Sequence, residues 1–129
     1  MMTTYLTDHE FLDQAIAYAR TMSQPAVINP GNTGARCTYR AIGHVPPCII
    51  GHFFDTDEER RRADGMGSVD ILLTEGFAPN RLRFVDIELL KAAQKTHDEI
   101  GLRTLKAEYP QFARILAAKL EELRPLCHD

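Results

Sequence analysis

The chain has 129 residues, which is the size of a single domain and enough to bury a core without disulfides or metals. Hydrophobic residues make up 44% and charged residues 26% of the sequence, which argues against a disordered or fibrous protein. The net charge of −3 gives no general attraction to nucleic acid or anionic lipid. We expect one globular domain over residues 1–129.

The expected cellular compartment is inferred from three features that the sequence does not show: a membrane span, a secretory signal and a set of paired cysteines. The longest uncharged apolar run, residues 45–50, is far too short to cross a bilayer, and the first ten residues do not read as a secretory signal. Three cysteines are an odd and small number for an oxidised scaffold. We therefore expect a cytoplasmic protein with reduced thiols.

The first helix is predicted from Thr7, which forms a capping box with Glu10. Leu6 and Phe11 occupy the positions of a hydrophobic staple. An apolar stripe follows at helical spacing, and it consists of Phe11, Leu12, Ala15, Ile16, Ala19 and Met22.

Residues 23–35 are predicted to be a loop because prolines, glycines and asparagines are dense there. Residues 26–28 and 37–42 can form two short strands, since the second segment alternates in polarity. Gly43 then turns the chain, and the pair Pro46-Pro47 favours the start of a helix that continues to Phe54.

Three further helices are predicted between residues 57 and 100. Thr56 caps a charged helix over residues 57–64, and Ser68 caps a short one that stops at Gly76. A longer helix with a broad apolar face runs over residues 82–100 and ends at Gly101.

The last apolar stripe covers residues 102–123, where Pro110 either kinks one helix or lies in the first turn of a second. The predicted fold class is mainly α. It is a compact domain of about five or six helices, in which residues 26–42 can form a small β-hairpin.

Candidate site residues concentrate in residues 36–55. Cys37, His44, Cys48 and His52 occur as C-x6-H-x3-C-x3-H, and these residue types can hold zinc tetrahedrally. Cys48 and His52 would share a helix face, with Cys37 and His44 closing over them from the hairpin. The spacing matches no common zinc finger, and a chain of this length needs no metal to fold.

A reactive thiol is the second interpretation of this stretch. A thiolate at Cys48 in the first turn of a helix would be stabilised by unpaired amides, and His52 could accept its proton. Alternatively, Cys48 is a small buried hydrophobic residue and His52 an ordinary polar neighbour. A disulfide between Cys37 and Cys48 is also open.

Positive charge gathers in residues 58–62 and at Arg81 and Arg83, a pattern typical of solvated helix faces. Residues 68–90 loosely resemble a helix-turn-helix, but Asp86 and Glu88 make its second helix acidic and unsuited to a DNA groove.

His97 lies beside Asp98 and Glu99 at the end of the long helix, and a carboxylate next to a histidine invites an acid–base interpretation. Consecutive residues do not share a helix face, so we do not expect them to interact.

Three short patterns carry a resemblance to known proteins: Cys37-Thr38-Tyr39, Pro47-Cys48-Ile49-Ile50-Gly51-His52, and a stretch from Ala93-Gln94 to Asp98 and Gly101. They resemble a group of small uncharacterised proteins from actinobacteria and their phages. His44 is not part of the shared pattern. The resemblance implies a phage or mobile-element origin and brings no activity, catalytic residue or cofactor with it.

The leading functional hypothesis is a small protein without catalytic activity that acts through protein–protein contact, either as a phage-encoded modulator of a host factor or as a homo-oligomer. The alternative is a thiol- or zinc-dependent enzyme or zinc-binding module centred on Cys48 and His52. A DNA-binding helix-turn-helix protein is the third hypothesis.

Overall fold

The computed structural model describes residues 5–28, 36–66 and 69–128. Across these residues the chain forms six α-helices: α1 (Asp8–Ala19), α2 (Ile49–His52), α3 (Asp57–Asp64), α4 (Val69–Thr74), α5 (Ile87–Arg103) and α6 (Tyr109–Glu121). Short 3-10 helices cover Asn80–Leu82, Lys106–Glu108 and Arg124–Leu126. The predicted mainly α fold class is confirmed.

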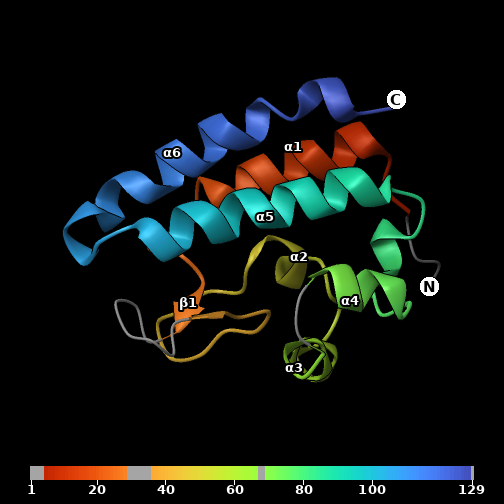
Figure 1. Cartoon of the computed structure of the whole chain (residues 1–129), viewed down its shortest axis with the longest axis horizontal. Coiled ribbons are helices and arrows are strands. Elements are labelled where there is room, and N and C mark those ends of the chain that lie inside the picture. The colour runs from red at the N-terminus through yellow and green to blue at the C-terminus, as the bar shows by residue number, and fades with distance from the viewer. Residues whose placement is uncertain (1–4, 29–35, 67–68, 129) are drawn as a thin grey trace.

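The helices form two layers (Figure 1). Helices α1, α5 and α6 lie side by side, and α6 contacts both of the others. Below them lie α2, α3, α4 and the strands β1 (Val27–Ile28) and β2 (Arg36–Cys37), which pair antiparallel. Helix α2 contacts α1 and α5, so the short helix connects the two layers.

The core lies between these layers. Its largest fully buried side chains come from helices α1, α2, α4, α5 and α6 and from two short segments next to them, and they are Phe11, Phe53, Phe112, Leu12, Ile49, Ile50, Leu72, Leu82, Leu89, Leu90, Leu116 and Leu120. No helix among the described residues combines the length and the apolar character of a membrane span.

The predictions for the first and third helices are confirmed. The Thr7 hydroxyl accepts the Glu10 amide and the Glu10 carboxylate accepts the Thr7 amide, as a capping box requires. Thr56 caps α3 in the same position. Ser68, the predicted cap of the next helix, lies outside the described residues.

Helix α5 differs from its prediction at both ends. It begins after Asp86, whose carboxylate accepts the Glu88 amide, rather than at Leu82. Gly101 lies inside the helix, where an added Cβ would be 3.0 Å from Pro25 and 3.2 Å from Val27. This glycine therefore allows β1 and its lead-in to approach α5, and it does not end the helix.

Two smaller predictions need the same kind of correction. The second strand is limited to Arg36–Cys37, because Ile42 and Val45 pair instead in an isolated bridge around Gly43, which has a φ of 59°. The helix expected from the prolines is limited to α2, with Cys48 as its N-cap. Pro110 lies in the first turn of α6, one of its two predicted places.

Candidate functional site: a buried polar cluster and an apolar groove

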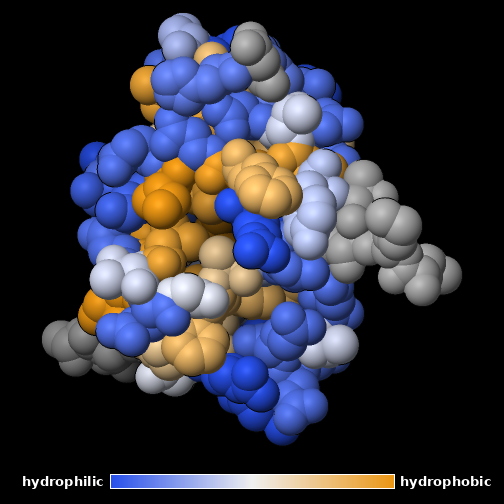
Figure 2. Space-filling view, turned by 90° about the vertical axis from the view of Figure 1, so that its right-hand side faces the viewer, coloured by the Kyte–Doolittle hydropathy of each residue, from blue (hydrophilic) through white to orange (hydrophobic). Residues whose placement is uncertain are grey.

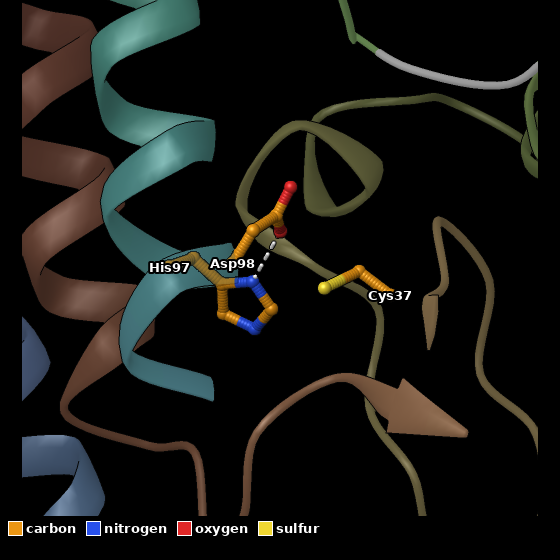
Figure 3. Close-up of side chains that lie close together, drawn as sticks. All are labelled: Cys37, His97 and Asp98. Atoms are coloured by element: carbon orange, nitrogen blue, oxygen red, sulfur yellow. Dashed lines mark hydrogen bonds and ion pairs between the residues drawn. The ribbon is translucent and has the colours of Figure 1, made fainter. Parts of the chain in front are cut away.

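A polar cluster joins β2 to the buried side of α5. The Sγ atom of Cys37, a ring nitrogen of His97 and a carboxylate oxygen of Asp98 all lie within 4.8 Å of one another. Figure 3 shows the three side chains pointing toward one another, with Cys37 facing the two residues from the helix. This is the one group of three or more such donors among the described residues.

The protonation of His97 follows from its two contacts. Its side chain is fully buried, and its Nε2 accepts the backbone N–H of Ala26 at 3.1 Å. Nε2 must therefore carry a lone pair, which places the proton of the neutral ring on Nδ1. Nδ1 donates this proton to Asp98 Oδ1 at 2.9 Å. The contacts thus select the neutral Nδ1–H tautomer.

The expectation that His97 and Asp98 would not interact is wrong. The rule on helix faces describes where side chains leave the backbone, and consecutive residues do leave in different directions. Nδ1 and Oδ1 are both close to the backbone, however, and both side chains bend into the same gap beside β2 (Figure 3).

Gln94 extends the cluster by one turn of α5. Its Oε1 accepts the Ile50 amide at 2.9 Å, and its Nε2 donates to Asp98 Oδ1 at 2.7 Å. Ile50 lies in the first turn of α2, where backbone amides have no helical partner. Gln94 and His97 therefore satisfy backbone amides of two irregular segments that pack on α5.

The Cys37 thiol is held in its protonated form. Burial, the negative charge of Asp98 and the hydrogen bond that the thiol donates to Asp98 all raise its pKa above the ordinary value. His97 cannot remove the proton, because the Ala26 amide occupies Nε2 and Nδ1 already carries a hydrogen. The cluster therefore lacks both a thiolate nucleophile and a free base.

The same contacts oppose a metal at this cluster. A metal bound by Cys37 and Asp98 would need the lone pair of His97 Nδ1, and the ring proton would then move to Nε2. That proton would point at the Ala26 N–H, so a hydrogen bond would become a contact between two donors. The residue types suit zinc, but the hydrogen bonding suits the metal-free network.

Cys48 is a helix cap rather than an exposed nucleophile. It is 1% exposed, and its Sγ accepts the Gly51 amide at 3.4 Å. Burial and the charge of Asp98 raise the pKa of the thiol far above its usual range. Cys37 and Cys48 are both free, and both line one cavity of about 400 Å³.

His52 is held away from Cys48 by an aromatic stack. Its ring lies on the Tyr18 ring, with centroids 3.9 Å apart and planes 10° from parallel. Burial and the charges of Arg81 and Arg60 lower the pKa of His52. The His52 amide donates to the Cys48 carbonyl at 2.9 Å, but no hydrogen bond joins the His52 ring to the Cys48 thiol in the described chain, and His44 is exposed. The four predicted zinc ligands thus form no common group there.

Two of the basic residues expected on solvated faces instead close the end of α2. Arg60 donates to the carbonyls of Gly51 and Phe54, both at 2.7 Å. Arg81 donates to the carbonyl of Phe53 at 3.1 and 3.2 Å. These guanidinium groups satisfy carbonyls that a helix terminus leaves without partners.

The cavity beside the cluster offers few unpaired polar groups. The Asp64 carboxylate accepts the Tyr39 amide at 2.6 Å and the Thr38 hydroxyl at 3.1 Å, and it pairs with Arg40 at 3.2 Å. Asp98 is likewise bonded within the chain. Asp64 and Asp98 therefore serve the fold, while Asp70, the third carboxylate that lines the cavity, is exposed and pairs with Lys91 at 3.7 Å.

A second hollow has a different chemistry. A groove of about 370 Å³ opens between the end of α4, the 3-10 helix Asn80–Leu82 and the start of α5. Its apolar lining residues are Leu73, Ala78, Pro79, Leu82, Val85, Ile87 and Leu90. Figure 2 shows hydrophobic side chains gathered around a hollow on this side of the molecule.

Large apolar side chains are exposed on the segments that form this groove, and Phe84 among them lines a separate hollow with Tyr5 and Asp86. Phe84 is 68% exposed and Ile87 50% exposed, and Phe77 is also exposed. Tyr5 contacts the Phe84 ring edge-on, with centroids 4.9 Å apart. We call the groove together with Phe77, Phe84 and Ile87 the docking face. It falls within residues 68–90, the segment that loosely resembled a helix-turn-helix.

Sequence reasoning did not identify the docking face or the role of α5 in the cluster. A signal for the cluster was present, because Gln94 and His97 lie on the same helical stripe as Leu90, Ala93 and Gly101. Comparison of the chain with protein families, curated proteins and solved structures found no match.

Proposed function

We propose that the protein acts without catalysis, by binding another protein chain through the docking face. The observation that supports this most is the open apolar groove beside Phe84, whose side chain is 68% exposed. Protein interfaces are enriched in aromatic side chains that fill pockets on the partner, and apolar patches of this kind mark such interfaces.

The chemistry of the cysteines favours binding over catalysis. The thiols of Cys37 and Cys48 both have raised pKa values because of burial and the charge of Asp98. The base nearest to Cys37, His97, has both ring nitrogens engaged. A thiol-dependent reaction would require all of these contacts to change first.

The resemblance to proteins of actinobacteria and their phages suggests where to look for a partner. We propose a protein of an actinobacterial host as the first class to search. A groove of apolar residues suits the apolar face of an amphipathic helix, which is a common element in such contacts.

The proposal is tested by comparing capture from host lysate by the wild-type protein and two variants. Phe84→Glu places a charge on the docking face, and Leu105→Glu places the same charge at a residue that is also 68% exposed but lies outside it. A partner retained by the wild type and by Leu105→Glu, but lost with Phe84→Glu, supports the proposal. Equal capture by all three proteins would contradict it.

A further inference from the structure

We propose that the cavity of about 400 Å³ beside the polar cluster binds a small organic amine, whose ammonium group contacts the Asp98 carboxylate and the Tyr39 hydroxyl. This inference goes beyond the proposed function, because the cavity shares no lining residue with the apolar groove. It draws on three observations: a buried hydroxyl without a partner, a carboxylate without a counter-cation, and an apolar wall.

The Tyr39 hydroxyl is a polar group that the fold leaves unused. Tyr39 is 6% exposed and its backbone amide donates to Asp64, but its hydroxyl forms no hydrogen bond within the described residues. The oxygen is not enclosed by other atoms, so it opens onto the cavity that Tyr39 lines. Buried polar groups almost always have a hydrogen-bond partner, and an exception of this kind calls for water or a ligand.

The Tyr39 hydroxyl also keeps its proton. Burial and the neighbouring Cys48 and Asp98 raise the pKa of Tyr39 above its ordinary value, which shows that the hydroxyl lies near the polar cluster. A protonated phenol oxygen retains lone pairs, and an ammonium group carries N–H donors and no acceptor. The hydroxyl can therefore accept one N–H of a bound amine.

Asp98 supplies a negative charge at the same place. No lysine or arginine pairs with it in the described chain, and its partner His97 is the neutral Nδ1–H tautomer. Gln94 and His97 both donate to Oδ1, and Figure 3 shows the other oxygen pointing away from the His97 ring. The Asp98 side chain is 33% exposed and lines the cavity, so a ligand cation can reach it.

The rest of the lining favours a cation with an apolar body. Asp64 and Asp70 also line the cavity, so carboxylates outnumber basic side chains among its described lining residues and an anion would be repelled. Lys95 is the basic one, and because it is exposed its ammonium group can remain in water. Val69 and Leu102 add apolar surface on which the hydrocarbon part of an amine can pack.

Titration with primary amines, followed by ¹⁵N NMR, tests the inference. The probes are benzylamine and cyclohexylmethylamine, and the controls are benzyl alcohol and benzoate, which are similar in size but uncharged and anionic. We expect both amines to shift the amide signals of Tyr39 and Asp98 saturably, with benzyl alcohol binding at least about tenfold more weakly because it lacks the charge. No saturable shift with either amine, or benzoate binding as tightly as benzylamine, would overturn the inference.

Tyr39→Phe tests the hydroxyl without disturbing the fold, because that group has no hydrogen-bond partner in the described chain. This variant should bind benzylamine about fivefold or more weakly, while Tyr109→Phe, which removes a hydroxyl outside the cavity, should match the wild type. Equal affinity in all three proteins would overturn the assignment. Both variants keep the docking face intact, so a failure of amine binding leaves the proposed function standing.

Discussion

Gln94 Oε1 accepts the backbone amide of Ile50 at 2.9 Å, and this bond joins two sequence patterns that are 44 residues apart. One contains the cap of α2 and the other forms the buried side of α5. Both belong to the residues in which the sequence led us to expect a resemblance to other small proteins. Their contact explains these patterns as parts of one packing arrangement, without requiring a catalytic role for them.

Gln94→Leu tests this arrangement through stability. The leucine leaves the Ile50 amide buried without an acceptor and removes a donor from Asp98. We expect the free energy of unfolding to fall by about 2 kcal/mol. Gln14→Leu makes the same change at an exposed position of α1 and should alter the free energy of unfolding by less than about 0.5 kcal/mol. Urea denaturation of both variants gives the comparison, and equal effects would refute the role of Gln94.

Gly51→Ala tests the close approach of α2 to the segment after β2. A Cβ at Gly51 would lie 2.1 Å from the Tyr39 carbonyl oxygen, so the backbone would have to move. We expect a loss of about 3 kcal/mol in unfolding free energy. At Gly65 a Cβ would be 3.5 Å from the nearest such atom, and Gly65→Ala should be neutral or slightly stabilising. A fully stable Gly51→Ala variant would contradict the packing.

Cys48 is expected to be unreactive in the folded protein. We predict that, in the folded state, a variant that retains only Cys48 reacts with a thiol reagent much more slowly than a variant that retains only Cys127. In denaturant, the two variants should react at the same rate. Fast labelling at neutral pH, with an apparent pKa below about 8.5, would restore the catalytic hypothesis.

The raised pKa of Cys48 also has a consequence for stability. The folded protein keeps the thiol proton at pH values where the unfolded chain loses it. Stability from this group is therefore complete below the unfolded pKa of about 8.5 and is lost as the pH rises above it. Cys48→Ala removes the titrating group, so its stability should depend less on pH in the alkaline range, as denaturation at several pH values would show.

Zinc should not bind stoichiometrically at Cys37, His97 and Asp98. The Ala26 amide holds His97 as the Nδ1–H tautomer, which has no lone pair toward the cluster. Elemental analysis should find well under one zinc per chain, and ¹⁵N spectra should show a protonated Nδ1. One zinc per chain, lost with Cys37→Ser but kept with Cys127→Ser, would contradict this assignment.

The sequence predicted those parts of the structure that depend on local chemistry. The capping box at Thr7, the cap at Thr56 and the apolar stripe of α1 need only neighbouring residues to form. Gly101 was misinterpreted because a glycine near the end of an apolar stripe has the same local pattern whether it ends a helix or admits another segment.

The site depended on contacts between distant residues. His97 was set aside on a rule about helix faces, whereas its role comes from Ala26, 71 residues earlier. Arg60 and Arg81 looked like surface charges, and only the position of α2 reveals the carbonyls that they bind. The docking face lies within one stretch, residues 68–90, but only the packing of α4, Asn80–Leu82 and the start of α5 reveals which of its apolar side chains line a hollow.

Photo-crosslinking from the docking face tests the central claim most directly. A photoreactive phenylalanine analogue is placed at Phe84 in one variant and at Leu105 in another, two positions of equal exposure. The account predicts a covalent protein adduct from position 84, at twice 14.6 kDa for a second copy or at another mass for a different partner, and none from position 105. No adduct from position 84, or equal adducts from both positions, would contradict it.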